Sequence, residues 1–119
     1  MGVKRIVANF AVERPRQAEA FYRDILDLDI VMDHGWILTF AAAESNGRPQ
    51  VSIASEGGSG TPVPDLSVEV DNLDEVLARV HAAGLPVEYG PADEPWGVRR
   101  FYVRDPAGRL INILCHPDA

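Results

Sequence analysis

The sequence contains a single cysteine, Cys115, and no apolar run close to the ~20 residues that a membrane-spanning helix needs. One cysteine excludes an internal disulfide and is typical of proteins from a reducing compartment. A signal peptide is lacking, and Ile6 stands where a myristoylation motif has serine or threonine. These absences predict a cytoplasmic protein with no membrane partner.

Basic residues are also few. The chain has 11 Lys and Arg against 18 Asp and Glu, which gives a formal net charge of −7. This balance argues against a nucleic-acid partner and favours a neutral or cationic small molecule, although solubility alone also explains it. The 119 residues, 46% hydrophobic and 24% charged, have the composition of one ordinary globular domain.

Residues that carry chemistry are sparse as well. The three histidines, His34, His81 and His116, have no metal-ligand spacing between them, so each is interpreted as a surface or packing residue. No nucleophile elbow, phosphate loop or Ser/His/Asp arrangement occurs. The pattern predicts no metal and no cofactor, and it identifies no catalytic residue.

The clearest structural signal is a β-hairpin near the carboxyl end. Residues 98–103 are rich in aromatic and β-branched side chains, and 110–115 are apolar apart from Asn112. Asp105, Pro106 and Gly108 between them supply a turn. Because its second strand is so apolar, the hairpin is predicted to lie inside a sheet with at least one buried face.

The remaining elements occur twice in the order βαβββ, about 60 residues apart. Asn46-Gly47 predicts a turn in the first copy, and Asn72 with Glu75 predicts a capping box at the helix of the second. The predicted strands are 4–12, 29–33, 36–42 and 50–54, then 65–71, 86–89, 98–103 and 110–115, with helices over about 15–28 and 73–83 and a loop over 90–97.

Three motifs carry a family resemblance. They are Asp105-Pro106-x-Gly108-x-Leu110-Ile111, residues 68–74, and residues 20–28, where Asp27 replaces a usual glycine. In their order along the chain, from residues 20–28 through 68–74 to 105–111, they resemble the vicinal oxygen chelate superfamily of glyoxalase I, extradiol dioxygenases and bleomycin-resistance proteins. The resemblance implies an α+β fold, with two tandem βαβββ modules forming a curled mixed sheet around a cleft. It places module 1 at about 1–56, a linker at 57–64 and module 2 at about 65–119 of a single domain, and it implies a homodimer.

The resemblance also implies four positions where family members carry metal ligands, namely Val7, Ser52, Asp65 and Asn112. Only Asp65 binds divalent ions well, because valine has no donor atom and the other two are neutral oxygen donors. The nearest branch is therefore the metal-free one that resembles bleomycin-resistance proteins.

Strand alternation extends the register from these positions to Ser67 and Glu69. The resemblance places Tyr102 and Arg100 toward the cleft. The module repeat, in which Phe40 corresponds to Tyr102 at a spacing of 62, then places Trp36 and Phe40 there as well. The predicted ligand-binding residues are Trp36, Phe40, Ser52, Asp65, Glu69, Trp96, Arg100, Tyr102 and Asn112. The predicted core under the helices is Ile6, Phe10, Ile53, Val68, Phe101, Ile111 and Ile113. In an alternative interpretation the aromatic residues fill the cleft as a second core, and the arginines pair with Asp65 and Glu69.

Three functions fit these observations. The first is a metal-free protein, like those of antibiotic resistance, that sequesters or carries an organic ligand in an aromatic and acidic cleft. The second is an enzyme of the superfamily, a lyase, isomerase or dioxygenase with a non-standard or metal-free site, in which Asp65 and Glu69 act as acid and base. The third is an interaction protein whose cleft is filled. The sequence leaves open whether the protein is an enzyme.

Overall fold

The computed structural model describes residues 2–42 and 49–117. It contains two compact units. The amino-terminal unit comprises Val7–Val63, and the carboxyl-terminal unit comprises the chain up to Ile6 together with the chain from Pro64 onward. Strand β1 begins in the second of these and ends in the first, and the predicted division into modules and linker stays a prediction.

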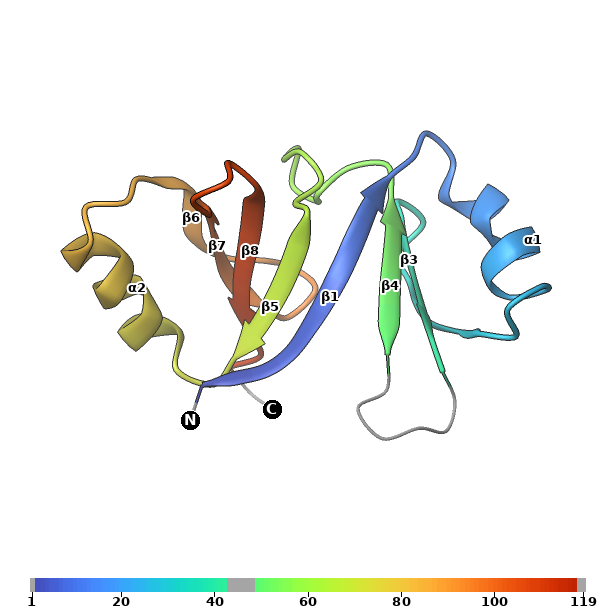
Figure 1. Cartoon of the computed structure of the whole chain (residues 1–119), viewed down its shortest axis with the longest axis horizontal. Helices are drawn as coiled ribbons and strands as arrows, with labels where there is room; N and C mark the ends of the chain where they lie inside the picture. Colours follow the sequence, from blue (N-terminus) through green and yellow to red (C-terminus); the bar gives the residue numbers. More distant parts are fainter. Residues whose placement is uncertain (1, 43–48, 118–119) are drawn as a thin grey trace. The chain divides into compact units, whose positions relative to one another are not determined.

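The amino-terminal unit holds a βαβββ arrangement (Figure 1). Its strands follow the order β2-β3-β4-β1, with β1 parallel to β4 and the other neighbours antiparallel. The turn predicted at Asn46-Gly47 lies outside the described residues. The elements are β1 (Val3–Ala11), the 3-10 helix η1 (Pro15–Ala18), α1 (Glu19–Tyr22), β2 (Asp29–Asp33), β3 (Ile37–Ala41) and β4 (Gln50–Ala54).

The first helix is shorter than predicted. Helical structure covers Pro15 to Tyr22 in two short pieces, and the chain then closes turns as far as Asp27. Asp27 adopts a left-handed φ of 62°, a conformation that aspartate tolerates better than most residues. The prediction that the helix continues to Leu28 is therefore wrong. The helix ends earlier, and Asp27 turns the backbone away from the helical conformation.

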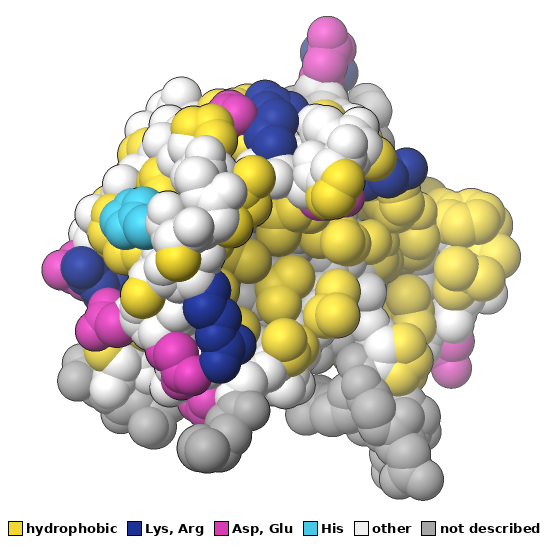
Figure 2. All heavy atoms as spheres, turned by 60° about the vertical axis from the view of Figure 1, so that its left-hand side comes forward, with side chains coloured by type: hydrophobic (Ala, Val, Ile, Leu, Met, Phe, Trp, Pro, Cys, Tyr) yellow, Lys and Arg dark blue, Asp and Glu magenta, His cyan; other side chains and the backbone are white. Residues whose placement is uncertain are grey.

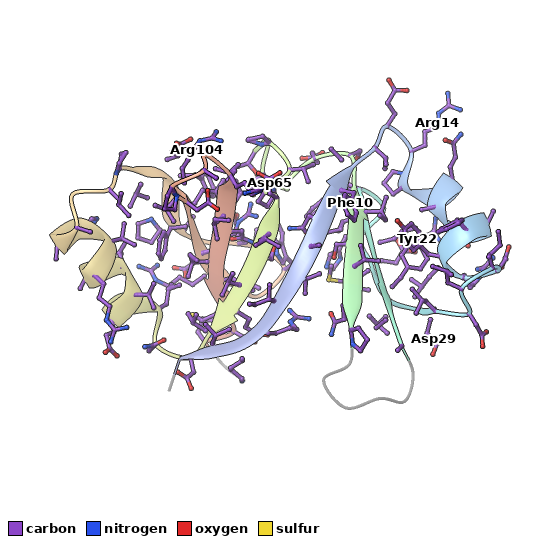
Figure 3. The ribbon with its side chains drawn as sticks, viewed as in Figure 1. Phe10, Arg14, Tyr22, Asp29, Asp65 and Arg104 are labelled. Atoms are coloured by element: carbon purple, nitrogen blue, oxygen red, sulfur yellow. The ribbon has the colours of Figure 1, made fainter. Side chains whose placement is uncertain are left out.

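The core of this unit lies between α1 and strands β3 and β4. Leu38, Phe40 and Ile53 are buried there, and Tyr22 packs against them from α1 (Figure 3). Phe10 does not join this cluster and is half exposed. The prediction that Phe10 is core is wrong, because α1 is short and its apolar side chains meet β3 and β4.

The carboxyl-terminal unit repeats the arrangement with strand order β5-β8-β7-β6. β5 runs parallel to β8, and the hairpin β7–β8 is antiparallel with Tyr102 opposite Asn112. The predicted hairpin is confirmed, whereas the strand predicted at 86–89 continues into the predicted loop. The elements are β5 (Leu66–Val70), α2 (Leu73–Ala82), β6 (Val87–Asp93), β7 (Arg99–Arg104) and β8 (Leu110–Cys115).

Helix α2 covers one face of these strands. Its buried residues Leu73 and Val80 share a cluster with Val68, Phe101, Val103, Ile111 and Ile113, which confirms the predicted core of this half. Ile6, predicted to join them, is more than half exposed and is a second wrong core assignment. No side chain caps α2, and Asn72 instead donates its amide N–H to the Glu75 carboxylate at 3.1 Å, so the predicted capping box is wrong.

Two βαβββ modules with parallel and antiparallel strand pairs confirm the predicted α+β fold class. Figure 2 shows apolar side chains reaching the surface among charged ones. In the ranges 2–42 and 49–117, no helix is long and apolar enough to cross a membrane. The large apolar side chains most exposed to solvent are Val3, Ile6, Phe10, Val12, Phe21, Ile25, Leu26, Val31 and Leu85.

Candidate ligand-binding face of the carboxyl-terminal unit

The sheet of the carboxyl-terminal unit has a second face, opposite α2, where polar side chains gather. Register pairs bring together residues of three strands, because directly paired residues share a face of a sheet. Ser67 pairs with Asn112 and Asn112 with Tyr102, while Leu114 pairs with both Glu69 and Arg100. We call Ser67, Glu69, Arg100, Tyr102 and Asn112 the polar face. The strand pairing confirms that Glu69, Arg100, Tyr102 and Asn112 share one side of the sheet, as predicted.

A buried ion pair lies at one side of this face. Arg100 donates from Nε to Oε2 of Glu94 at 2.6 Å, and the two side chains are only 3% and 4% exposed. The same carboxylate oxygen accepts the Tyr89 hydroxyl at 2.8 Å, and the Tyr102 hydroxyl oxygen accepts from Arg100 Nη1 at 3.0 Å. Charge-assisted hydrogen bonds of this kind compensate the cost of burying an arginine.

Three aromatic rings surround the same guanidinium. Its central carbon lies 5.0 Å from the ring centres of Trp96 and Tyr102 and 5.3 Å from that of Tyr89. A cation is attracted by ring faces within about 6 Å. We call Tyr89, Glu94, Trp96, Arg100 and Tyr102 the arginine cage.

The backbone beside the cage is close-packed at Gly90. This glycine has a φ of 81°, and a Cβ added to it would lie 2.5 Å from the Arg100 carbonyl oxygen. The pairing of β6 with β7 shifts register on both sides of Tyr89. Gly90 thus allows the bulge that sets the Tyr89 ring against Tyr102, with ring centres 5.3 Å apart.

An unsatisfied amide lies next to the cage. Asn112 is 7% exposed and donates from Nδ2 to the Ser67 hydroxyl oxygen at 3.1 Å. Its carbonyl oxygen Oδ1 is buried and accepts no hydrogen bond from any described residue. A buried acceptor without a donor costs free energy, and a ligand donor relieves this cost once the atoms that shield the oxygen move aside.

At the other side of the polar face, Glu69 is held by two cationic or ionisable partners. Arg5 Nε lies 3.1 Å from one carboxylate oxygen, and His116 Nδ1 lies 2.8 Å from the other. The alternative prediction that an arginine pairs with Glu69 is confirmed. The prediction that His116 is a plain surface residue missed this contact.

Asp65 has a structural role at the start of β5 (Figure 3). Its Oδ2 accepts the Leu110 backbone N–H at 2.9 Å, and its own N–H donates to the Leu110 carbonyl at 2.8 Å. This contact holds the first residues of β5 and β8 together. The structure places Asp65 outside the cluster formed by Asn112, Tyr102 and Arg100.

The ligand-binding residues predicted in the amino-terminal unit have separate surroundings. Ser52 is buried and shares a 2.7 Å hydrogen bond with Thr39, and Trp36 stacks on His34 with ring centres 6.0 Å apart. Phe40 is fully buried beside Tyr22, with ring centres 5.4 Å apart. The prediction that Phe40 faces the cleft is wrong, because it lies on the helix-facing side of β3 while Thr39 occupies the other side.

The family's metal-ligand positions do not fit a metal ion in this chain. Val7 offers no donor, Ser52 is engaged by Thr39, and Asp65 is engaged by the Leu110 backbone. Within the described part of the chain, no three His, Cys, Asp or Glu side chains form a group that could hold a metal. Neutral oxygen donors such as Asn112 seldom bind a transition metal alone.

Sequence reasoning missed Tyr89 and Glu94 as members of the site. Glu94 was assigned to a surface loop, yet its side chain is buried and also lines a cavity of about 290 Å³ with Gly97 and Val98. One signal could have identified it. An arginine predicted to point inward needs a counter-charge, and Glu94 is the acid nearest to Trp96 in the sequence.

Comparisons with known proteins agree with this fold. The family model described as Glyoxalase/Bleomycin resistance protein/Dioxygenase superfamily matches residues 3–113. No curated protein matches the sequence.

Solved structures share the fold over nearly the whole chain. An NAD-dependent benzaldehyde dehydrogenase of Legionella pneumophila is 19% identical with a TM-score of 0.72, over 93% of this chain and 98% of that one. The methylmalonyl-CoA epimerase of Mycobacterium tuberculosis is 18% identical with a TM-score of 0.61, over 96% and 87%. A superfamily member from Vibrio splendidus 12B01 is 15% identical with a TM-score of 0.63, over 93% and 97%. At these identities the likeness shows the fold alone.

Proposed function

We propose that this chain, which belongs to the glyoxalase/bleomycin resistance protein/dioxygenase superfamily, binds a small organic ligand at the polar face without using a metal ion. The observation that carries the proposal is the buried Asn112 Oδ1, which has no donor among the described residues. A ligand N–H or O–H group supplies that donor. The ligand is therefore a molecule with at least one hydrogen-bond donor and an apolar body.

The surroundings of Asn112 support an apolar and aromatic contact. Tyr102 is its partner across the strands, and the Trp96 ring, on the loop between β6 and β7, lies against the Arg100 guanidinium. Binding sites for small molecules combine apolar and aromatic side chains with a few placed polar groups. Because the Arg100 charge is compensated by Glu94 inside the protein, the cage favours a neutral ligand over an anion.

An enzyme of the superfamily remains the second candidate, because Glu69 and His116 form a pair able to move protons. Methylmalonyl-CoA epimerases are among the proteins of similar fold. The homodimer, the cytoplasmic location and the likeness to antibiotic resistance stay predictions.

A ligand screen tests the proposal. Neutral aromatic and heteroaromatic compounds are added to the full chain, and the shift of the melting temperature is measured. A compound that binds the folded state and not the unfolded state raises the melting temperature. A compound that stabilises the wild type is then titrated against Asn112→Leu, which removes the carbonyl oxygen. Loss of one hydrogen bond should weaken binding about 3- to 10-fold, corresponding to ~0.5–1.5 kcal/mol.

Thr39→Val provides the matched control, since it removes a buried hydroxyl contact in the amino-terminal unit. It should leave the ligand affinity unchanged. The proposal is wrong if no compound of this class stabilises the wild type, or if Asn112→Leu binds as tightly as Thr39→Val.

A further inference from the structure

We propose that the ligand of the polar face carries a cyclic cis-amide, that is, a lactam whose N–H and C=O lie side by side on one edge of a ring, and that the Asn112 side chain recognises both groups at once. The inference rests on the proposed function for the place where the molecule binds. It adds the chemical class of the ligand and assigns the specificity to one residue.

The side-chain amide of Asn112 has more hydrogen-bonding capacity than the chain uses. A carboxamide offers two N–H donors and one carbonyl oxygen. One N–H of Asn112 bonds the Ser67 hydroxyl oxygen at 3.1 Å, and Oδ1 accepts from no described residue. Among the described residues, one donor and one acceptor therefore stay open, and both belong to the same planar group.

Burial makes these two open groups matter for binding. Asn112 is 7% exposed, so solvent supplies little of the missing hydrogen bonding. A buried polar group without a partner costs free energy, and a ligand that pairs with it removes this cost. The ligand reaches the amide once the atoms that shield it move aside.

A donor and an acceptor on one amide select their own complement. Asparagine side chains read nucleic-acid bases in this way, through a bidentate pair in which the side-chain oxygen accepts and the side-chain N–H donates. The complement in a small neutral molecule is an N–H group next to a C=O group. A ligand with only one of these groups leaves the other group of Asn112 unpaired, and buried polar groups left unpaired are the strongest source of discrimination between similar ligands.

The neighbours of Asn112 indicate the rest of the ligand. Leu110 and Leu114 lie two residues away on β8, one on each side, and are buried on the same face of the strand. The aromatic residue Tyr102 lies directly opposite on β7. The amide is therefore bordered by apolar and aromatic side chains, which fit a flat fused ring better than an open-chain polar amide.

An ionised ligand fits the amide less well than a lactam. A carboxylate only accepts hydrogen bonds and an ammonium group only donates them, so each satisfies half of the amide. The charges of Arg100 and Glu69 on the polar face are already balanced by partners within the protein. The expected ligand is therefore a neutral fused-ring lactam.

Three compounds of the same bicyclic shape test the inference. Oxindole is a fused-ring lactam with N–H next to C=O, indole keeps the N–H without the carbonyl, and N-methyloxindole keeps the carbonyl without the N–H. Their dissociation constants for the full chain are measured by titrations followed by heteronuclear NMR, which also reports the side-chain NH₂ signals of Asn112. The absence of those signals in Asn112→Leu assigns them.

We expect oxindole to bind the wild type at least about fivefold more tightly than either analogue, the lower end of what a bidentate pair contributes to discrimination. Oxindole should also shift the Asn112 NH₂ signals more than indole does, because only the lactam carbonyl gives the open N–H an acceptor. Asn112→Leu should lose the preference for oxindole. Thr39→Val, whose substitution lies in the amino-terminal unit, is the matched control and should keep it.

The order of the three affinities in the wild type tests the inference even if Asn112→Leu folds poorly. The inference is overturned if indole or N-methyloxindole binds as tightly as oxindole, if oxindole does not bind, or if Asn112→Leu keeps the preference.

These outcomes separate the inference from the proposed function. A donor compound from the melting-temperature screen that binds through Asn112, without any preference for the lactam, supports the binding site and refutes the lactam as its ligand class. A preference for oxindole that persists unchanged in Asn112→Leu refutes both, because the binding then does not depend on the amide.

Discussion

Arg100 donates a 2.6 Å hydrogen bond from Nε to Oε2 of Glu94, and both side chains are almost fully buried. The two residues lie six positions apart, on either side of the turn that carries Trp96. A buried ion pair adds little net stability compared with apolar residues, but removal of one partner leaves an uncompensated charge. This relationship makes Glu94 the residue on which the arginine cage depends.

Glu94→Gln should therefore destabilise the protein strongly. The expected loss in the free energy of unfolding is about 3–5 kcal/mol, measured by denaturant titration, because Arg100 loses its buried counter-charge. Asp93→Asn is the matched control. Asp93 faces Arg99 at 3.4 Å with its side chain largely exposed, so its loss should cost within about 1 kcal/mol. Equal losses in the two variants would contradict the structural importance of the pair.

Tyr102→Ala should destabilise the fold about as much as Ile111→Ala, by roughly 2–5 kcal/mol each, since both side chains are buried. Tyr102→Phe separates the ring from the hydroxyl. It keeps the packing against Tyr89 but removes the acceptor for Arg100 Nη1, which should cost about 1.5–3 kcal/mol because the donor is charged. A Tyr102→Phe variant with the same free energy of unfolding as the wild type would show that this hydrogen bond contributes nothing to stability.

Gly90→Ala and Gly35→Ala form a pair matched in backbone conformation, as both glycines have a φ of 81°. A Cβ at position 35 would meet nothing within 4 Å, so that variant should cost about 1–2 kcal/mol for the left-handed backbone alone. At position 90 the Cβ would collide with the backbone of Arg100. This clash should add roughly 1–3 kcal/mol, measured by thermal or denaturant unfolding. Similar costs at both positions would contradict the close approach of β6 and β7.

The thiol of Cys115 should react slowly with disulfide reagents at neutral pH. Burial raises the pKa of the Cys115 thiol, and the thiolate is the reactive form. A raised pKa means less thiolate at a given pH, so the rate should increase only as the solution becomes more alkaline than an ordinary thiol requires. Chain unfolded in denaturant provides the reference. A folded chain that reacts as fast as the reference would contradict the effect of burial.

The carboxyl-terminal unit was predictable because several local signals agree there. The Asp105-Pro106 turn fixes the hairpin register, and the family resemblance assigns Asn112 and Tyr102, and with Tyr102 its neighbour Arg100, to the polar face. What could not be predicted was the partner of Arg100. The bulge at Gly90 lets β6 continue into the expected loop as far as Asp93 and brings Glu94 inside, and no alternation pattern signals such a bulge.

The amino-terminal unit was predicted less well because its register came from a repeat count. Phe40 was aligned with Tyr102 at a spacing of 62, but it is Thr39 that pairs with Ser52, as Tyr102 pairs with Asn112. A slip of one residue turns every side chain to the opposite face of a strand. Phe10 was misassigned for another reason, because core packing depends on the true length of α1.

The internal compensation of Arg100 by Glu94 has a consequence for ionic strength. A salt bridge shielded from water is screened only weakly, because mobile ions do not enter the space around it. Because the charge of Arg100 is already balanced by Glu94, the site also exerts only a weak net electrostatic field on an approaching molecule. Association at the arginine cage should thus be governed by shape and hydration, with nearly the same strength in dilute buffer and in concentrated salt.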